Sequence, residues 1–429
     1  MTDWAGHPAV ASTTEAAGPG RPSAGLAPLG AHGTPGQVLA LIRAQGDVTR
    51  AELVGRTGLS RATIGARLES LQRAGLVAAA ETATTSRGRP PSRFRFRHEG
   101  GVLLIADAGA TGVRLAVTDL AGTVLRQSRH SIDIASGPEP WLGEVLSAFG
   151  GLLGSAGLGA SDVRGIGLAL PGPVDSAAGM VVSPPIMTGW DRYPIRAFLG
   201  AHFSCPVVVE NDANAMAIGE HRLSHPDVSS MLMLKLATGI GAGLITGGVI
   251  FRGADGAAGD IGHIQVVVPE EGDPPLCRCG NRGCIEAYAG GWALVRDLRD
   301  AGRYVDSVHD AARLVAAGDP VATTLLRRAG RIVGIALSDA VSLLNPEVVV
   351  VGGELAVAED HLFAGIRESV YARSLPLATR RLQILPAVQR EMAGVSGLVT
   401  ALCDHLYDAS RIDALMTAAA SSPSSASAD

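Results

Sequence analysis

The spacing of hydrophobic residues in the N-terminal quarter of the chain predicts three short helices. Apolar side chains recur there every three or four residues, which is the period of a helix that buries one face. A capping box, Thr49-Arg50-Ala51-Glu52, opens the second helix, and Gly58 ends it. The third helix begins near Ser60. The positions expected to face the shared core are Val38, Leu39, Ile42, Ile64, Leu68 and Leu71.

Two short segments with strand character follow the third helix. Gly75-Leu76-Val77 ends that helix and starts one strand, and Phe94-Arg95-Phe96 is the other. Between them lies Arg87-Gly88-Arg89-Pro90, whose Gly and Pro predict the tip of a loop. Two helices joined by a tight turn and followed by a hairpin are typical of a winged helix-turn-helix, which we place at residues 36–98.

The charge of this segment differs from that of the whole chain. Residues 36–98 hold 11 Arg and 4 acidic residues, a balance of +7, whereas the full chain carries −5. A basic module joined to an acidic body indicates that the module meets a polyanion, here double-stranded operator DNA. A small helical bundle with a solvated basic face is the alternative. The expected DNA contacts are Ser60, Arg61, Thr63, Arg67, Arg87 and Arg89.

From residue 99 onward, continuous apolar runs predict buried strands. Such runs are typical of strands covered on both faces of a sheet. They occur in two successive groups and end in loops rich in Gly, Asp or Asn, which predicts two α/β lobes, 99–225 and 226–410, with a cleft between them. The runs are Val102–Ala106, Leu115–Val117, Ile166–Leu170, Pro206–Val209, Met231–Leu236 and Val348–Val351.

Amino-acid composition indicates the state of the two chain ends and the cellular location of the protein. Residues 1–35 and 411–429 are rich in small and polar residues, so we expect both to be disordered tails. No run approaches the roughly 20 apolar residues that a membrane-spanning helix needs. No secretory signal peptide is visible either. We therefore expect a cytoplasmic protein with no membrane partner.

Three of the five cysteines are clustered. Cys277, Cys279 and Cys284 lie within eight residues, and His263 stands fourteen residues before the first of them. This clustering does not suit a disulfide framework, and the Cys-x-x-Cys spacing of a redox dithiol is missing. One imidazole and three thiolates form a closed tetrahedral set that suits a structural Zn²⁺ ion. Free thiols are the alternative.

The sequence around this cluster resembles the ROK family, named for repressors, uncharacterised reading frames and sugar kinases. His263 is followed by the pattern Cys-x-Cys-Gly-x-x-Gly-Cys-x-Glu. Leu236–Leu244 with Gly253 beyond it, and Ala257–His263, are similar to two further segments of the family. The motifs occur in the family's order over about 101–410. The resemblance implies an α/β fold in which the winged helix-turn-helix precedes a two-lobed actin-like, hexokinase-like ATPase domain.

The resemblance also implies a sugar site. Asn211 and Asp212 correspond to a pair that contacts the sugar, and in the kinases this Asp takes the proton from the attacking hydroxyl. Asp260, His263 and Glu286 correspond to further sugar ligands. His263 would give one ring nitrogen to zinc and the other to the sugar. The alternative for Asn211 and Asp212 is a capping or turn role, because both residue types favour strand ends.

Two glycine-rich loops resemble the phosphate loops of the family's kinases. Backbone N–H groups of such loops can hold phosphates, and an Asp can hold Mg²⁺ through water. Ala110, Gly112 and Asp260 differ from the residues usual in the kinases, so ATP and Mg²⁺ are expected only if kinase activity is retained. Plain tight turns are the alternative. The expected nucleotide contacts are Asp107, Gly109, Thr111, Thr238, Gly239, Gly241, Gly352 and Gly353.

These observations support two functions. The first is a sugar-responsive transcriptional regulator, a repressor, whose lobes bind a sugar or sugar phosphate and whose DNA-binding heads pair in a homodimer or homotetramer. The second is an ATP-dependent kinase of a hexose or amino sugar, with Asp212 as its base. The basic N-terminal module favours the regulator. The presence of Asp212 and the intact Thr-Gly-x-Gly loop favour the kinase.

Overall fold

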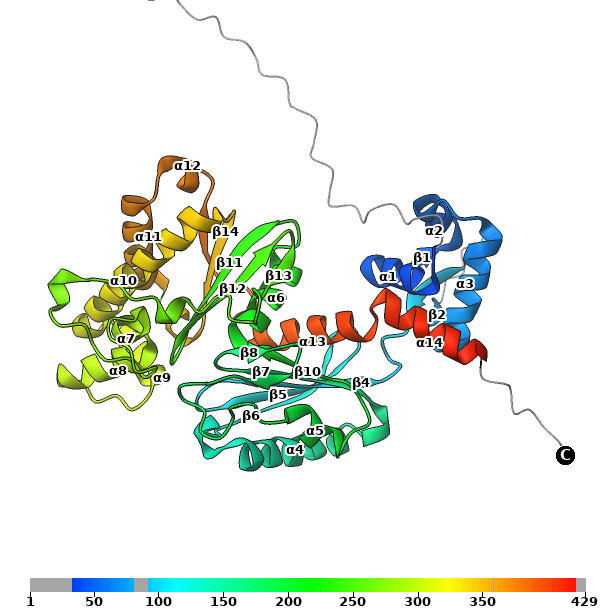
Figure 1. The fold of residues 1–429 in the computed structure, drawn as a ribbon, viewed down its shortest axis with the longest axis horizontal. Helices are drawn as coiled ribbons and strands as arrows, with labels where there is room; N and C mark the ends of the chain where they lie inside the picture. Colours follow the sequence, from blue (N-terminus) through cyan, green and yellow to red (C-terminus); the bar gives the residue numbers. More distant parts are fainter. Residues whose placement is uncertain (1–32, 81–91, 358, 422–429) are drawn as a thin grey trace, which may run out of the picture.

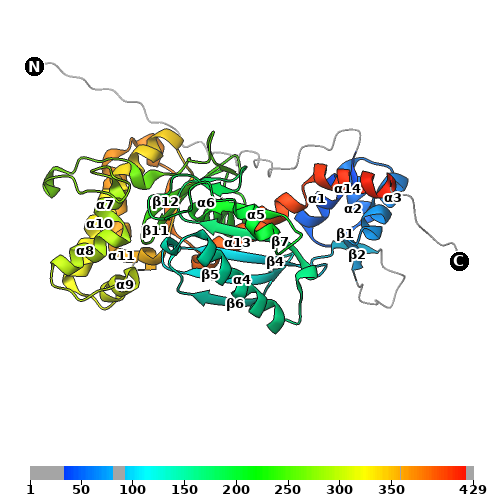
Figure 2. The same cartoon turned by 60° about the horizontal axis from the view of Figure 1, so that its bottom comes forward.

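The computed structural model describes residues 33–80, 92–357 and 359–421, which form three bodies (Figure 1). An N-terminal module lies at one end, and two larger lobes make up the rest. Helix α13 runs from between the lobes towards the N-terminal module (Figures 1 and 2). Within the described residues, every helix is too short or too polar to cross a lipid bilayer.

The N-terminal module contains the three predicted helices and a three-stranded sheet in the order β1-β3-β2. The expected capping box is formed, because the Thr49 hydroxyl accepts from the Glu52 N–H at 3.2 Å. Ile64, Leu68 and Leu71 are fully buried, as predicted. Strand β1, which precedes the second helix, adds to the predicted hairpin. The elements are α1 (Pro35–Gln45), β1 (Val48–Thr49), α2 (Arg50–Thr57), α3 (Arg61–Arg73), β2 (Val77–Ala80) and β3 (Arg93–Phe96).

The folded module begins earlier than the composition predicts. Thr34 caps α1, and its capping box with Gln37 is complete. The expected disordered tail at 1–35 is therefore wrong for its last three residues, because a local capping motif fixes them. The rest of that tail, and residues 422–429, lie outside the described residues.

The expected disorder from residue 411 is also wrong. Helix α14 (Ala409–Ser421) packs along α1 and close to α3 (Figures 1 and 2). Ile412 is buried in the core of the N-terminal module, and Asp413 Oδ1 accepts from the Gly36 N–H at 2.8 Å. This small, polar segment is helical because the module supplies a surface for it.

Lobe 1 is built on a five-stranded sheet in the order β10-β7-β4-β5-β6. The first three strands are parallel, and the last three are joined as antiparallel hairpins. Leu104 and Leu115 face α4, whereas Leu103 and Ile105 face α13. The main elements are β4 (Val102–Ala108), β5 (Val113–Asp119), β6 (Val124–His130), α4 (Pro138–Ser155), β7 (Val163–Leu170), α5 (Ile195–Gly200) and β10 (Val207–Asn211), with a small ribbon of β8 (Val174–Asp175) and β9 (Met180–Val181).

Lobe 2 repeats this plan with the order β13-β12-β11-β14-β15. Val349 and Val351 face the helices α10 and α11, whereas Val348 and Val350 face α6. The elements are β11 (Ser230–Leu236), β12 (Ile240–Thr246), β13 (Val249–Phe251), α7 (Ile285–Ala289), α8 (Gly291–Asp300), α9 (Val308–Ala316), α10 (Pro320–Leu344), β14 (Val348–Gly352), α11 (Glu359–Arg373), α12 (Pro376–Thr379) and β15 (Gln383–Pro386).

Two helices cross between the lobes and change the predicted division of the chain. α6 (Asp212–Ser224), expected in lobe 1, packs on β11 and β12 of lobe 2. α13 (Ala393–Leu406), expected in lobe 2, packs on the sheet of lobe 1. The two helices also touch closely, since a Cβ on Gly397 would lie 1.7 Å from the Ala215 carbonyl oxygen. Any movement of one lobe against the other therefore acts on this helix pair.

Candidate functional site

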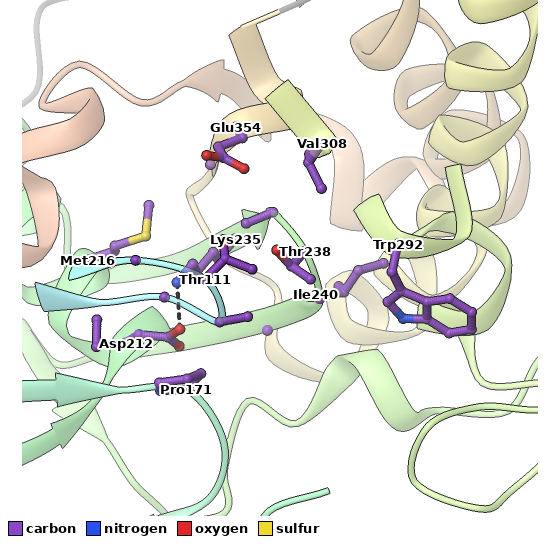
Figure 3. A pocket seen from close by; sticks show the side chains of 18 of the residues that line it. Thr111, Pro171, Asp212, Met216, Lys235, Thr238, Ile240, Trp292, Val308 and Glu354 are labelled. Atoms are coloured by element: carbon purple, nitrogen blue, oxygen red, sulfur yellow. Dashed lines mark hydrogen bonds and ion pairs between the residues drawn. The ribbon is translucent and has the colours of Figure 1, made fainter. Parts of the chain in front are cut away.

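A cleft of about 1620 Å³ opens between the two lobes, at the ends of strands β4, β7, β10, β11 and β14. Figure 3 shows Asp212, Lys235, Thr238 and Trp292 around it. The structure brings all the sugar and nucleotide candidates of the sequence together, because they line this one cleft, and their contacts with a ligand stay predictions. The candidates are Asp107, Gly109, Thr111, Asn211, Asp212, Thr238, Gly239, Gly241, Asp260, His263, Glu286, Gly352 and Gly353.

Both predicted phosphate loops are tight hairpin turns. The first joins β4 to β5, and its Gly109 N–H donates to the Gly112 carbonyl at 2.8 Å. The second joins β11 to β12, where the Ala237 N–H donates to the Gly239 carbonyl at 3.0 Å. Tight turns were the alternative to a phosphate-binding role, and the geometry is that of turns. Nucleotide contact stays a prediction.

Asn211 and Asp212 stand at the N-terminus of α6, directly after strand β10. Asn211 is the N-cap, because its Oδ1 accepts from the Asn214 N–H at 3.1 Å while its Nδ2 donates to the Gly172 carbonyl at 2.9 Å. The capping alternative is thus confirmed for Asn211. Asp212 is 8% exposed, and its Oδ1 accepts from the Ala213 N–H at 2.7 Å.

Glu210 is a residue next to this site that the sequence reasoning did not select. It is 1% exposed, and its Oε2 accepts from Nε and Nη2 of Arg252 at 2.9 and 2.6 Å. Its Oε1 accepts from the Asn211 N–H and from Asn214 Nδ2. Because Arg252 follows β13 of lobe 2, this half-buried ion pair joins the two lobes beside the cleft. An acidic residue inside an otherwise apolar strand was the available signal.

Lys235 is a second residue that the sequence reasoning missed. Its Nζ lies 2.5 Å from Asp212 Oδ2 (dashed line in Figure 3). Burial lowers the pKa of Lys235, but the carboxylates of Asp212 and Asp107 outweigh it and raise this pKa above its usual value. Burial raises the pKa of Asp107 to about 6, against the opposing charge of Lys235. Lys235 is the only lysine among the 36 Lys and Arg residues of the sequence, and that was the signal.

Glu286 stabilises the second glycine loop through a hydrogen bond. Its Oε2 accepts from the Ile240 N–H at 3.0 Å, and its Oε1 accepts from the Trp292 indole N–H at 3.2 Å. Two guanidinium groups lie close to the Trp292 ring, that of Arg278 at 4.8 Å and that of Arg296 at 5.4 Å from its centre. Trp292, which the sequence reasoning did not select, therefore links Glu286 to the cysteine loop that carries Arg278.

The predicted metal ligands come together in space. One donor atom from each of His263, Cys277, Cys279 and Cys284 lies within 4.8 Å of all the others, so the group can hold a metal ion. His263 Nδ1 is 3.7 Å from the Cys277 sulfur, and its Nε2 is 3.9 Å from Asp260 Oδ1 on the cleft side. His263 thus faces both the cluster and the cleft, as the prediction requires.

The predicted DNA contacts are only partly grouped. Ser60 caps α3, and its hydroxyl accepts from the Thr63 N–H at 3.1 Å, next to the exposed Arg61. Arg67 is half-buried, and its Nε donates to the Gly33 carbonyl at 3.3 Å, so its contact with DNA stays a prediction. The two wing arginines, Arg87 and Arg89, lie outside the described residues.

The fold therefore defines a DNA-binding module joined to a two-lobed, hexokinase-like domain with a ligand-sized cleft. Comparison with protein families agrees with this class. A winged helix-turn-helix DNA-binding family matches residues 34–78, and the ROK family matches residues 104–404. The chain belongs to the ROK family.

Its relatives include both repressors and kinases. The xylose repressor of Bacillus subtilis (strain 168) is 26% identical over 84% of this chain and 92% of its own length. The glucokinase of Streptomyces coelicolor is 32% identical over 70% of this chain and 96% of its own length.

Two similar solved structures also include one regulator and one kinase. A ROK family transcriptional regulator, described as a homolog of the E. coli MLC protein, superposes with a TM-score of 0.74 at 26% identity, covering 89% of this chain and 98% of its own. A ROK family glucokinase from Streptomyces griseus, in complex with glucose and AMPPNP, has a TM-score of 0.62 at 30% identity and covers 70% and 99%.

Proposed function

We propose that the chain is a transcriptional repressor. Its ROK domain binds a sugar and thereby changes the affinity of the winged helix-turn-helix for operator DNA. One observation carries the proposal: the regulators compared above match a greater share of the chain than the glucokinases do. The xylose repressor and the regulator structure cover 84% and 89% of the chain, whereas the glucokinases cover 70%. That smaller share is close to the ROK domain without its N-terminal module.

Helix α13 is the proposed path from the cleft to the DNA. It begins beside Asp107, since a Cβ on Gly394 would lie 2.3 Å from Asp107 Oδ2. At its other end, the Tyr407 ring packs edge-on against Phe96 at 4.9 Å, with the Arg43 guanidinium 5.1 Å away. Helix α14 then continues onto α1. A sugar that binds one lobe arrangement more tightly would shift this helix pair and, with it, the module.

We propose that the cysteine cluster holds Zn²⁺ in a structural role. Three thiols and one imidazole complete a tetrahedral set and leave no position for a substrate or water. When bound, the ion would fix the ring of His263, which faces Asp260 across the cleft wall. The ion would also hold Arg278, and so would support the stacked Trp292 and its partner Glu286.

We propose that the active form has at least two DNA-binding heads. A recognition helix reads one half-site, and dimers of such modules bind two half-sites about one helical turn apart. Closed symmetry makes a homodimer or homotetramer the simplest arrangement. The partners are then operator DNA and a sugar or sugar-phosphate effector.

A second candidate function is ATP-dependent sugar phosphorylation. Asp212 lines the cleft at the place expected for the base, and glucokinases are among the relatives. This function needs Asp212 to accept a proton from the sugar hydroxyl. The ion pair with Lys235 opposes that role, because one oxygen of Asp212 already accepts a hydrogen bond from the Lys235 ammonium.

Replacing Arg61 with Ala is expected to weaken operator binding about tenfold. The residue is exposed at the start of α3, where a recognition helix meets base edges or phosphates. Fluorescence anisotropy with a DNA fragment from upstream of the chain's own gene measures the effect. A matched loss of charge, Arg126→Ala on the surface of lobe 1, should leave the affinity unchanged. Equal affinity in Arg61→Ala and Arg126→Ala would remove α3 from the DNA interface.

A further inference from the structure

The lone lysine lies where two carboxylates of the cleft converge. Lys235 Nζ is 2.5 Å from Asp212 Oδ2, and its charge also interacts with Asp107. The three residues come from three different elements: β4, the start of α6, and β11. Asp107 belongs to strand β4 and Asp212 directly follows strand β10, both strands being in the sheet of lobe 1, whereas Lys235 lies on β11 in the sheet of lobe 2. The ammonium of Lys235 is thus paired with Asp212 and lies near enough to Asp107 to interact with its charge.

The choice of lysine at this position is chemically specific. Of the 36 Lys and Arg residues of the sequence, every one except Lys235 is an arginine, including the basic residues elsewhere in the cleft. A guanidinium is broad and planar, whereas an ammonium is a compact point charge with three donors. Only the compact group resembles a small bound cation in size and charge distribution. A position between two carboxylates is also the place where a protein would hold Mg²⁺.

We propose that the Lys235 ammonium is a built-in cation that takes the place of a divalent metal ion between Asp107 and Asp212. This inference rests on the proposed function, in which the cleft binds a sugar without transferring a phosphoryl group. The donor set present here therefore does not fit Mg²⁺. Both oxygens of Asp212 are already engaged, one by Lys235 and the other by the Ala213 N–H at 2.7 Å.

The charge of Lys235 affects which ligands the cleft favours. With Lys235 in place, the three groups carry one net negative charge at most, so a divalent ion meets both a reduced attraction and a nearby positive charge. A neutral sugar hydroxyl is not affected by the reduced attraction or by the nearby positive charge. It can hydrogen-bond to Lys235 and to the two carboxylates. Lys235 is thus a specificity-determining residue that favours an uncharged sugar over a metal–nucleotide complex.

The test compares Mn²⁺ binding, followed by electron paramagnetic resonance, in the zinc-loaded full chain and in Lys235→Met. Met keeps similar length and removes the charge. We expect the unmodified chain to bind no Mn²⁺ at this site and Lys235→Met to gain it, with at least about tenfold tighter binding from the removed repulsion. The gain should vanish in Lys235→Met with Asp212→Asn. Arg313→Met, which removes a positive charge from another part of the cleft, should gain nothing.

Two outcomes would overturn the proposal. One is Mn²⁺ binding by the unmodified chain as tight as that of Lys235→Met. The other is no gain in Lys235→Met while its sugar-dependent thermal stabilisation shows that the variant is folded. If Lys235→Met does not fold, Mn²⁺ titration of the unmodified chain still decides the matter. The proposed repressor function is tested by a different result: it would be wrong if no sugar alters operator binding.

Discussion

Replacing Gly36 with Ala is expected to detach helix α14 and to disconnect DNA binding from the sugar cleft. A Cβ at this position would lie 2.1 Å from the Ala409 carbonyl oxygen, where there is no room for it. The clash pushes α14 off α1 and breaks the bond between the Gly36 N–H and Asp413. Overpacking of this kind costs about 1–3 kcal/mol of the free energy of unfolding. The variant should bind operator DNA but no longer respond to sugar.

Hydrogen exchange measures the detachment directly. Amides of α14 should lose protection in Gly36→Ala, and the melting temperature of the N-terminal module should fall by about 4 °C or more. Gly55→Ala is the matched control in the same module, since nothing lies within 4 Å of its Cβ. Alanine is the better helix former by up to about 1 kcal/mol, so this control should be neutral or stabilising. Equal protection of α14 in both variants would contradict the proposed link.

Replacing Cys279 with Ser is expected to remove the metal ion and to weaken sugar binding. The change takes one of four donors from a cluster whose donor atoms lie within 4.8 Å of one another. Without the ion, His263 loses its fixed ring orientation, and Arg278 no longer holds the stacked Trp292. Changes to groups that support a metal site cost about 10- to 100-fold in affinity or activity, and we expect sugar affinity to fall in that range.

Elemental analysis and calorimetric titration with sugar test this prediction together. The unmodified chain should contain about one zinc per chain, which follows from a single closed set of four ligands. Cys205→Ser, in a thiol outside the cluster, should keep both the metal and the sugar affinity. Full metal content in Cys279→Ser would disprove the ligand set. Metal loss with unchanged sugar affinity would disprove its link to the cleft.

Features set by neighbours along the chain could be predicted from the sequence. The capping box at Thr49 needs only Glu52, three residues on, and both are where the pattern places them. The metal cluster is similar, because its four ligands fall within residues 263–284 and glycines bend the loop between them. In the cleft, the predicted glycine loops and the pair Asn211 and Asp212 lie at the ends of buried strands, and the carboxyl ends of parallel strands meet at a common edge.

Features set by distant parts of the chain could not be predicted. Helix α14 has a weak pattern of its own, and it is stabilised by burying Ile412 against a module more than 300 residues earlier. Arg67 has the helical phase of an outward residue, but its Nε also donates to the carbonyl of the distant Gly33. Lys235 interrupts an apolar strand without any local reason. Its role becomes visible only when Asp212, which follows a strand of the other sheet, lies beside it.

Operator binding measured with and without sugars tests the central claim most directly. Fluorescence anisotropy of a labelled upstream DNA fragment would be followed with the unmodified chain and a panel of pentoses, hexoses and their phosphates, without ATP. The account predicts that at least one of them changes the operator affinity by about 5- to 150-fold, the usual range of coupling between two sites. Unchanged operator affinity across the panel, together with ADP release from ATP in the presence of one sugar, would contradict it.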